Sequence, residues 1–211
     1  MAIIEDIASA VERGKKKEVG PLVQQAIDEG IDPQTILNEG LIDAMSVIGD
    51  KFSRNEVFVP EMLVAARAMS TGTDILKPYL ADAGTESVGH AVIGTVAGDM
   101  HDIGKNLVRM MVEGKGIEID DLGVDVPNEK FVEYIKEHPE CNLVMLSALL
   151  TTTMPRLPEV VQAITDAGLR DQVKIMIGGA PVTQEFADEI GADAYTPDAG
   201  SASAKAAELC S

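Results

Sequence analysis

The chain has 211 residues, of which 45% are hydrophobic and only 3% aromatic, so aliphatic side chains and methionine must fill any core. Its 35 acidic and 17 basic side chains give a formal net charge of −18, which argues against nucleic acid as a partner, because phosphate backbones require clustered lysine and arginine. Two cysteines without paired spacing, an N-terminus unlike a signal peptide and the lack of any bilayer-length apolar run lead us to expect a soluble cytoplasmic protein that binds no membrane.

The first 85 residues have the pattern of helices. Apolar residues recur at helical spacing in four runs, near residues 3–11, 19–27, 36–48 and 63–80. Asp32 and Pro33 suit the start of the third helix, and Pro60 suits the start of the fourth. Four helices with short connections predict a four-helix bundle over residues 1–85. The small polar run at residues 83–87 predicts a linker.

From residue 88 to residue 211, short apolar runs alternate with helical runs. Strands are expected near 91–97, 118–123, 142–148, 173–178 and 192–195. Helices are expected near 104–115, 128–137, 154–168, 183–190 and from about 200 onward. This alternation predicts an α/β domain with a doubly wound, Rossmann- or flavodoxin-like parallel sheet of five strands. In such a sheet, ligands bind at the loops that follow the carboxyl ends of the strands.

Three of these loops carry polar or glycine-rich segments. The loop after the first strand holds Asp99, Met100, His101, Asp102, Ile103 and Gly104. Ser147 closes the third strand and the threonines 151–153 follow it, while Gly178 and Gly179 follow the fourth. One of the threonines is expected to cap the next helix. Capping needs a single hydroxyl, so the cluster also predicts a binding role.

His101 is the candidate metal ligand in this set. A zinc or iron site needs further histidine or cysteine ligands, but His90 and His138 are distant in sequence. A metal held in a macrocycle needs only one protein nitrogen, because the ring supplies the other ligands. An aspartate two residues away can hold the other imidazole nitrogen. An ordinary surface histidine remains the alternative.

Together the segments resemble the signature of a known family. Asp-x-His-x-x-Gly, then Ser-x-Leu, then Gly-Gly, separated by 42 residues (105–146) and 28 residues (150–177), is similar to the cobalamin-binding motif of B12-dependent methyltransferases and mutases. With its helical N-terminal segment, the whole chain resembles the stand-alone corrinoid proteins of anaerobic methyl-transfer systems. Those systems serve methylamines, methanol, methoxy-aromatics or betaines.

The resemblance implies a role for each matching residue. His101 would be the lower axial ligand of cobalt, in the arrangement called base-off, His-on, and Asp99 would hydrogen-bond its other nitrogen. Thr153 occupies the position of the serine that completes a His-Asp-Ser relay in methionine synthase. Phe58 would pack over the upper face of the corrin, with an ordinary helix-packing role as the alternative. The full implied cofactor-binding set is Phe58, Asp99, Met100, His101, Asp102, Ile103, Gly104, Ser147, Leu149, Thr151, Thr153, Gly178 and Gly179.

The implied function is that of a methyl carrier with cobalamin as its cofactor. A substrate-specific methyltransferase would methylate Co(I), and a second methyltransferase would take the methyl group from methyl-Co(III), with a reductive activase as a further candidate partner. The chain would be catalytic only as the corrinoid subunit of that system. The alternatives are a cobalamin-binding regulator or sensor, the small subunit of an adenosylcobalamin mutase, and a flavodoxin-like protein without a corrinoid.

Overall fold

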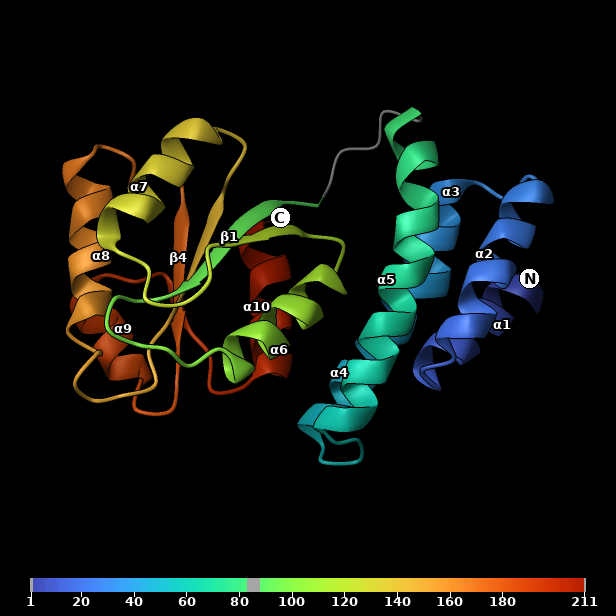
Figure 1. Ribbon diagram of the computed structural model, residues 1–211, viewed down its shortest axis with the longest axis horizontal. Coiled ribbons are helices and arrows are strands. Elements are labelled where there is room, and N and C mark those ends of the chain that lie inside the picture. Colours follow the sequence, from blue (N-terminus) through green and yellow to red (C-terminus); the bar gives the residue numbers. More distant parts are fainter. Residues whose placement is uncertain (1, 83–87, 211) are drawn as a thin grey trace. The chain divides into compact units, whose positions relative to one another are not determined.

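The computed structural model describes residues 2–82 and 88–210 (Figure 1). The chain divides into two compact units, Met1–Glu86 and Ser87–Ser211. The linker expected at residues 83–87 lies outside the described residues. No helix in the described ranges combines the length and the apolar character that crossing a membrane requires.

The N-terminal unit contains the four expected helical segments. They are α1 (Ala2–Glu12), α2 (Lys16–Asp28), the continuous run of α3 (Pro33–Thr35), η1 (Ile36–Ile42) and α4 (Asp43–Ser53), and α5 (Val59–Asp82). The third begins as predicted, because the Asp32 carboxylate accepts a hydrogen bond of 2.9 Å from the Thr35 N–H. The π-helical turn η1 was not predicted, since apolar spacing does not distinguish it from an α-helix.

The C-terminal unit is a five-stranded parallel sheet with the strand order β2-β1-β3-β4-β5. The strands are β1 (His90–Thr95), β2 (Glu118–Asp121), β3 (Leu143–Ser147), β4 (Lys174–Gly178) and β5 (Ala194–Tyr195). The helices are α6 (Ile103–Glu113), α7 (Asn128–Glu137), α8 (Arg156–Asp166), α9 (Gln184–Ile190) and α10 (Ala199–Cys210). The predicted doubly wound fold is therefore confirmed.

Alternate residues along each strand fill two separate cores. On β1, Val92 belongs to the cluster under α7, α8 and α9, whereas Ala91 and Ile93 belong to the cluster under α6 and α10. Figure 1 shows these two groups of helices on opposite faces of the sheet. Because side chains alternate between the faces of a strand, a sheet covered on both sides needs the continuous apolar runs seen in the sequence.

The strand order places the candidate loops at one edge of the sheet. Neighbouring β1 and β3 connect to helices on opposite faces, which makes the space beyond their carboxyl ends a topological switch point. The last residues of β1, β3 and β4 are in register, with Thr95 paired to Ser147 and Ser147 paired to Gly178.

The two glycines after β4 face different surroundings. A Cβ atom on Gly179 would lie 1.8 Å from the Ala148 carbonyl oxygen, and the φ angle of Gly179 is +135°. A Cβ atom on Gly178 would make only an ordinary contact of 3.5 Å with the Thr196 carbonyl oxygen. The fold itself therefore requires Gly179 but not Gly178.

We expect Gly179→Ala to lower the free energy of unfolding by about 3 kcal/mol or more, because it adds backbone strain and a collision with the Ala148 backbone. Gly178→Ala is the matched control and should change it by less than about 1 kcal/mol. Urea denaturation followed by circular dichroism measures both. Equal losses in the two variants would contradict the interpretation.

Candidate cofactor-binding site

The loop between β1 and α6 is held in one shape by neighbouring segments. The Thr95 hydroxyl donates a hydrogen bond of 2.9 Å to the His101 carbonyl oxygen. The Gly98 N–H donates to the Asp125 carboxylate at 2.6 Å, and the Asp125 N–H donates to the Asp99 carbonyl oxygen at 2.9 Å. Gly98 has a φ angle of +82°, a left-handed conformation that favours glycine. These bonds restrict the backbone of the loop, so the loop can hold a side chain in a defined position.

The Asp99 carboxylate lies at the centre of the site and is fully buried. Its Oδ1 atom accepts hydrogen bonds from His101 Nδ1 at 2.7 Å and from the His101 N–H at 3.1 Å. Its Oδ2 atom accepts from the Thr153 hydroxyl at 2.7 Å and from the N–H groups of Leu149 at 2.7 Å and Leu150 at 3.3 Å. One carboxylate therefore joins the loop after β1 to the loop after β3.

These donors determine the charge of Asp99 and the tautomer of His101. Burial raises the pKa of Asp99, but the hydrogen bonds from Thr153, Leu149 and His101 outweigh burial and hold that pKa well below the usual aspartate range. The carboxylate is therefore ionised at neutral pH and only accepts hydrogen bonds, so His101 Nδ1 carries a proton. Nε2 is then the ring nitrogen that does not face Asp99, on a side chain that is 48% exposed, and it could hold a metal.

The surface around His101 is unusually apolar. Met100 is 68% exposed and Ile103 80% exposed, and Leu149 and Leu150 are also exposed. A Cβ atom on Gly104 would meet no atom within 4 Å. Exposed apolar side chains grouped around one imidazole fit a large apolar ring lying over that imidazole, such as a corrin.

The other predicted site residues fall into three groups. Ser147 and Gly178 lie in register at the same sheet edge, and Thr151 is exposed in the loop that follows β3. Asp102 is exposed directly before α6 and makes no capping hydrogen bond with its side chain. Phe58 belongs to the helical unit and is 63% exposed, so the alternative of an ordinary helix-packing role is wrong.

The expectation that a threonine caps the helix after β3 is also wrong. Helix α8 begins at Arg156, its N-cap residue is Pro155, and no side chain makes a capping hydrogen bond. The hydroxyl of Thr153 lies close to Asp99 and to the Leu150 carbonyl oxygen instead. The polypeptide makes a turn between Thr151 and the helix, which takes the threonines away from the capping position.

Sequence reasoning missed a buried ion pair beside the site. Lys105, in the first turn of α6, places its Nζ atom 2.5 Å from Asp121 Oδ2 at the end of β2. Burial raises the pKa of Asp121, but the hydrogen bonds from Lys105 and the Gly123 N–H, together with the charges of Lys105 and Arg109, outweigh burial and lower that pKa overall. The pair fixes the start of α6 to the sheet. The adjacent residues Asp120 and Asp121 at the end of the short strand β2 were the signal in the sequence, because a carboxylate removed from water needs a cation or several hydrogen-bond donors.

Comparisons with known proteins identify proteins that are similar to this chain. A family model described as a B12 binding domain matches residues 89–206, and a second B12 binding domain model matches residues 3–77. The chain is 43% identical over 208 residues to dimethylamine corrinoid protein 1 of Methanosarcina acetivorans, covering 98% of this chain and 97% of that protein. It is 43% identical over 187 residues to the trimethylamine corrinoid protein of Methanosarcina barkeri, covering 87% of this chain and 85% of that protein.

A solved structure is similar over the full length. The methanol:cobalamin methyltransferase complex of Methanosarcina barkeri matches with a TM-score of 0.87 and 28% sequence identity. The match covers 99% of this chain and 80% of the matched chain.

We expect Thr153→Val to lower the free energy of unfolding by about 2 to 3 kcal/mol, because the buried Asp99 charge loses a hydrogen-bond donor while the side-chain shape is kept. Thr153→Ser keeps the hydroxyl and should cost about 1 kcal/mol or less, the contribution of one methyl group. Chemical denaturation at neutral pH measures both. A serine variant as unstable as the valine variant would show that the hydroxyl is unimportant.

The lowered pKa of Asp99 also predicts a pH dependence. The group is ionised in the folded protein over a wider pH range than in the unfolded chain, so its stabilising contribution is present at neutral pH and is lost as pH falls through the folded-state pKa. The stability difference between wild type and Asp99→Asn should therefore be constant above about pH 5 and shrink below the ordinary aspartate pKa of about 3.9. Denaturation curves of both proteins between neutral and acidic pH provide the measurement, and a difference that grows on acidification would contradict the assignment.

Proposed function

The chain belongs to the B12-binding domain family, and from this premise we propose that it is a corrinoid methyl carrier of a methylamine methyltransferase system. Its cofactor is a corrinoid, such as cobalamin. One observation carries the proposal: an ionised, buried aspartate holds an exposed imidazole at the topological switch point of the sheet. When bound, the corrinoid supplies a cobalt centre able to accept and release a methyl group.

In this proposal His101 would be the protein ligand that holds the cobalt of the corrinoid, through Nε2. Asp99 keeps the proton on Nδ1 through the bond of 2.7 Å and makes the imidazole a stronger ligand. Thr153 donates to the other carboxylate oxygen and holds Asp99 in place. The bond from His101 Nδ1 to Asp99 would hold the imidazole in the same position with or without cobalt.

Two glycines support a path for the nucleotide tail of cobalamin along the carboxyl ends of the strands. Gly178 and Gly104 have no collision within the chain that would demand glycine, so a ligand lying against the backbone would explain them. Ser147 shares this edge with Gly178 and offers a hydroxyl group to the tail. We assign Leu149 and Thr151 to the same path of the nucleotide tail. We assign Met100, Asp102 and Ile103 to contacts with the corrin ring.

We assign Phe58 of the helical unit to contact with the corrin. A B12 binding domain model matches this unit, and Phe58 is a large apolar side chain that the unit leaves exposed. An exposed phenylalanine is suited to cover an apolar ring.

The names of similar proteins support a methylamine as the source of the methyl group. The chain is similar over nearly its whole length to proteins named for dimethylamine and trimethylamine. We propose that it receives a methyl group from a methyltransferase specific for a methylamine and passes it to a second methyltransferase. The similar structure is part of a methyltransferase complex, which supports direct contact with such partners.

The first test is a comparison of wild type with His101→Ala after anaerobic loading with hydroxocobalamin. We expect wild type to bind the corrinoid and the variant to show a changed visible spectrum and weaker retention, because the axial nitrogen is gone. His138→Gln, which removes a histidine outside the site, is the control and should resemble wild type.

Two results would contradict the proposal. Failure of the folded wild-type protein to bind a corrinoid would overturn the function itself. An unchanged spectrum in His101→Ala would keep the binding domain but remove His101 as the ligand.

A further inference from the structure

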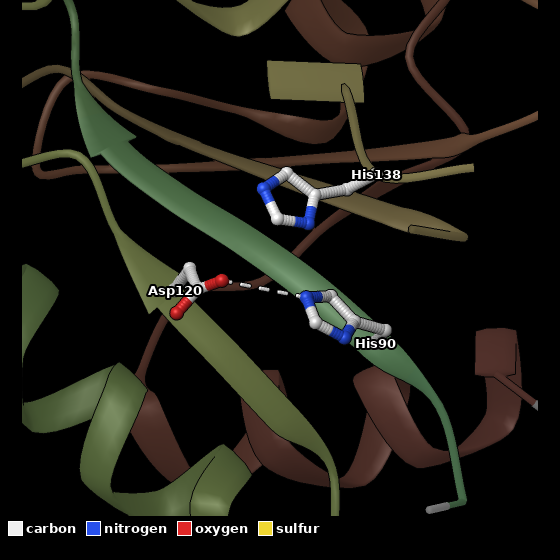
Figure 2. Close-up of side chains that lie close together, drawn as sticks. All are labelled: His90, Asp120 and His138. Atoms are coloured by element: carbon white, nitrogen blue, oxygen red, sulfur yellow. Dashed lines mark ion pairs between the residues drawn. The ribbon is translucent and has the colours of Figure 1, made fainter. Parts of the chain in front are cut away.

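A second group of ligand-type side chains lies at the other end of β1, away from Asp99 and His101. His90 is the first residue of β1, Asp120 lies on the edge strand β2, and His138 follows directly after α7. Figure 2 shows the three side chains turned toward one another. One possible ligand atom from each lies within 4.8 Å of the others. The fold thus unites two histidines that are far apart in the sequence.

Each histidine of this group has a carboxylate beside its Nδ1 atom. His138 Nδ1 lies 3.0 Å from Glu140 Oε1, and His90 Nδ1 lies 3.5 Å from Glu118 Oε2. A carboxylate on one ring nitrogen orients the imidazole and makes the other nitrogen a better metal ligand. Both histidines therefore have, beside Nδ1, the outer partners that metal-binding histidines use, and Nε2 is the atom that each would offer to an ion.

Stacking fixes the position of the two rings. The ring of Tyr134 stacks on that of His138 with centroids 4.2 Å apart, and the His90 and His138 rings stack at 5.9 Å. The Tyr134 hydroxyl lies 2.8 Å from His90 Nε2 and 2.5 Å from Asp120 Oδ2. Burial and the Asp120 carboxylate raise the pKa of Tyr134, which keeps it a phenol that donates to Asp120.

A hydrogen-bond network alone explains only part of the group. It accounts for His90, Tyr134 and Asp120, whose polar atoms bond to one another. His138 bonds to Glu140 instead, yet its ring is held against the same cluster. An ion shared by His90, Asp120 and His138 explains why all three converge.

We propose that His90, Asp120 and His138 bind a divalent transition-metal ion of the zinc class. Two imidazole nitrogens and one carboxylate oxygen suit Zn²⁺ better than Mg²⁺ or Ca²⁺, which prefer oxygen ligands throughout. Three protein ligands leave a fourth position for water. The Tyr134 hydroxyl donates to Asp120, so it accepts its bond from His90 Nε2. To bind the ion, His90 takes the tautomer with its proton on Nδ1, facing Glu118, and the bond from Nε2 to the Tyr134 hydroxyl is lost. The ion joins the start of β1, the edge strand β2 and the end of α7.

The test is calorimetric titration of zinc chloride into the full-length, corrinoid-loaded protein. We expect one saturable zinc ion per chain in wild type, and a loss of affinity of about tenfold or more in His138→Gln. His138 is partly exposed, so this variant should fold. Zinc should also raise the melting temperature of wild type but not of the variant.

Two matched variants exclude other zinc ligands. The chain has three histidines and two cysteines, and Cys141 is buried. Cys210→Ser removes an alternative ligand outside the cluster and should bind zinc like wild type. His101→Ala removes another, and it should bind zinc like wild type when both proteins are titrated without corrinoid. Tyr134→Phe should bind zinc at least as tightly as wild type, because the competing hydroxyl bond to His90 is gone.

The proposal is overturned if wild type shows no saturable zinc binding, or if His138→Gln binds zinc as tightly as wild type. Loss of zinc binding in His101→Ala, Cys210→Ser or Tyr134→Phe would also overturn it, since the ion would then belong to a different set of ligands. None of these outcomes depends on His101 being the axial ligand of the corrinoid.

Discussion

The buried charge of Asp99 is the constraint on which the cofactor site depends. An ionised carboxylate removed from water is unfavourable by several kcal/mol unless hydrogen-bond donors replace the lost water. Here the donors come from two loops, with His101 after β1 and with Leu149 and Thr153 after β3. Satisfying the charge therefore brings the two loops together, and the same bonds leave one nitrogen of His101 facing outward. The positions of both loops and of the His101 imidazole thus depend on a single group, the Asp99 carboxylate.

Sheet geometry explains why these loops meet and which glycines are needed for it. The register of β1, β3 and β4 brings their last residues into line, so motif pieces far apart in the sequence reach the same edge. Gly179 serves the fold, because a side chain there would collide with the Ala148 carbonyl group. Gly178 and Gly104 have no such collision with the described residues, so packing against these residues does not require glycine at either position. A single glycine pair thus contains one residue required by the fold and one available to a ligand.

Sequence patterns predicted the order and type of the elements, because both units are built from long apolar periodicities that tertiary contacts reinforce. They failed where the outcome depends on contacts between distant residues. The threonines after β3 have the composition of a helix cap, yet Thr153 bonds to Asp99, 54 residues away in the sequence. That contact was expected only from the family resemblance. The Lys105–Asp121 pair and the cluster at His90 and His138 were not predicted, since both require the register of β2 beside β1.

The two ends of β1 carry histidines whose surroundings suit different kinds of metal. At the carboxyl end, one imidazole stands among exposed apolar side chains, and its carboxylate partner is already engaged by the donors of two loops. This end offers a single nitrogen ligand, which is too few for a free ion. A metal held in a macrocycle needs only one protein ligand. At the amino end, two imidazoles and Asp120 converge among further carboxylates, which attract a cation that has no other ligands. A corrin gains nothing from that polar cluster. The two proposals therefore assign a cobalt held in a ring and a free divalent ion to separate ends of the same strand, on the basis of polarity and ligand number.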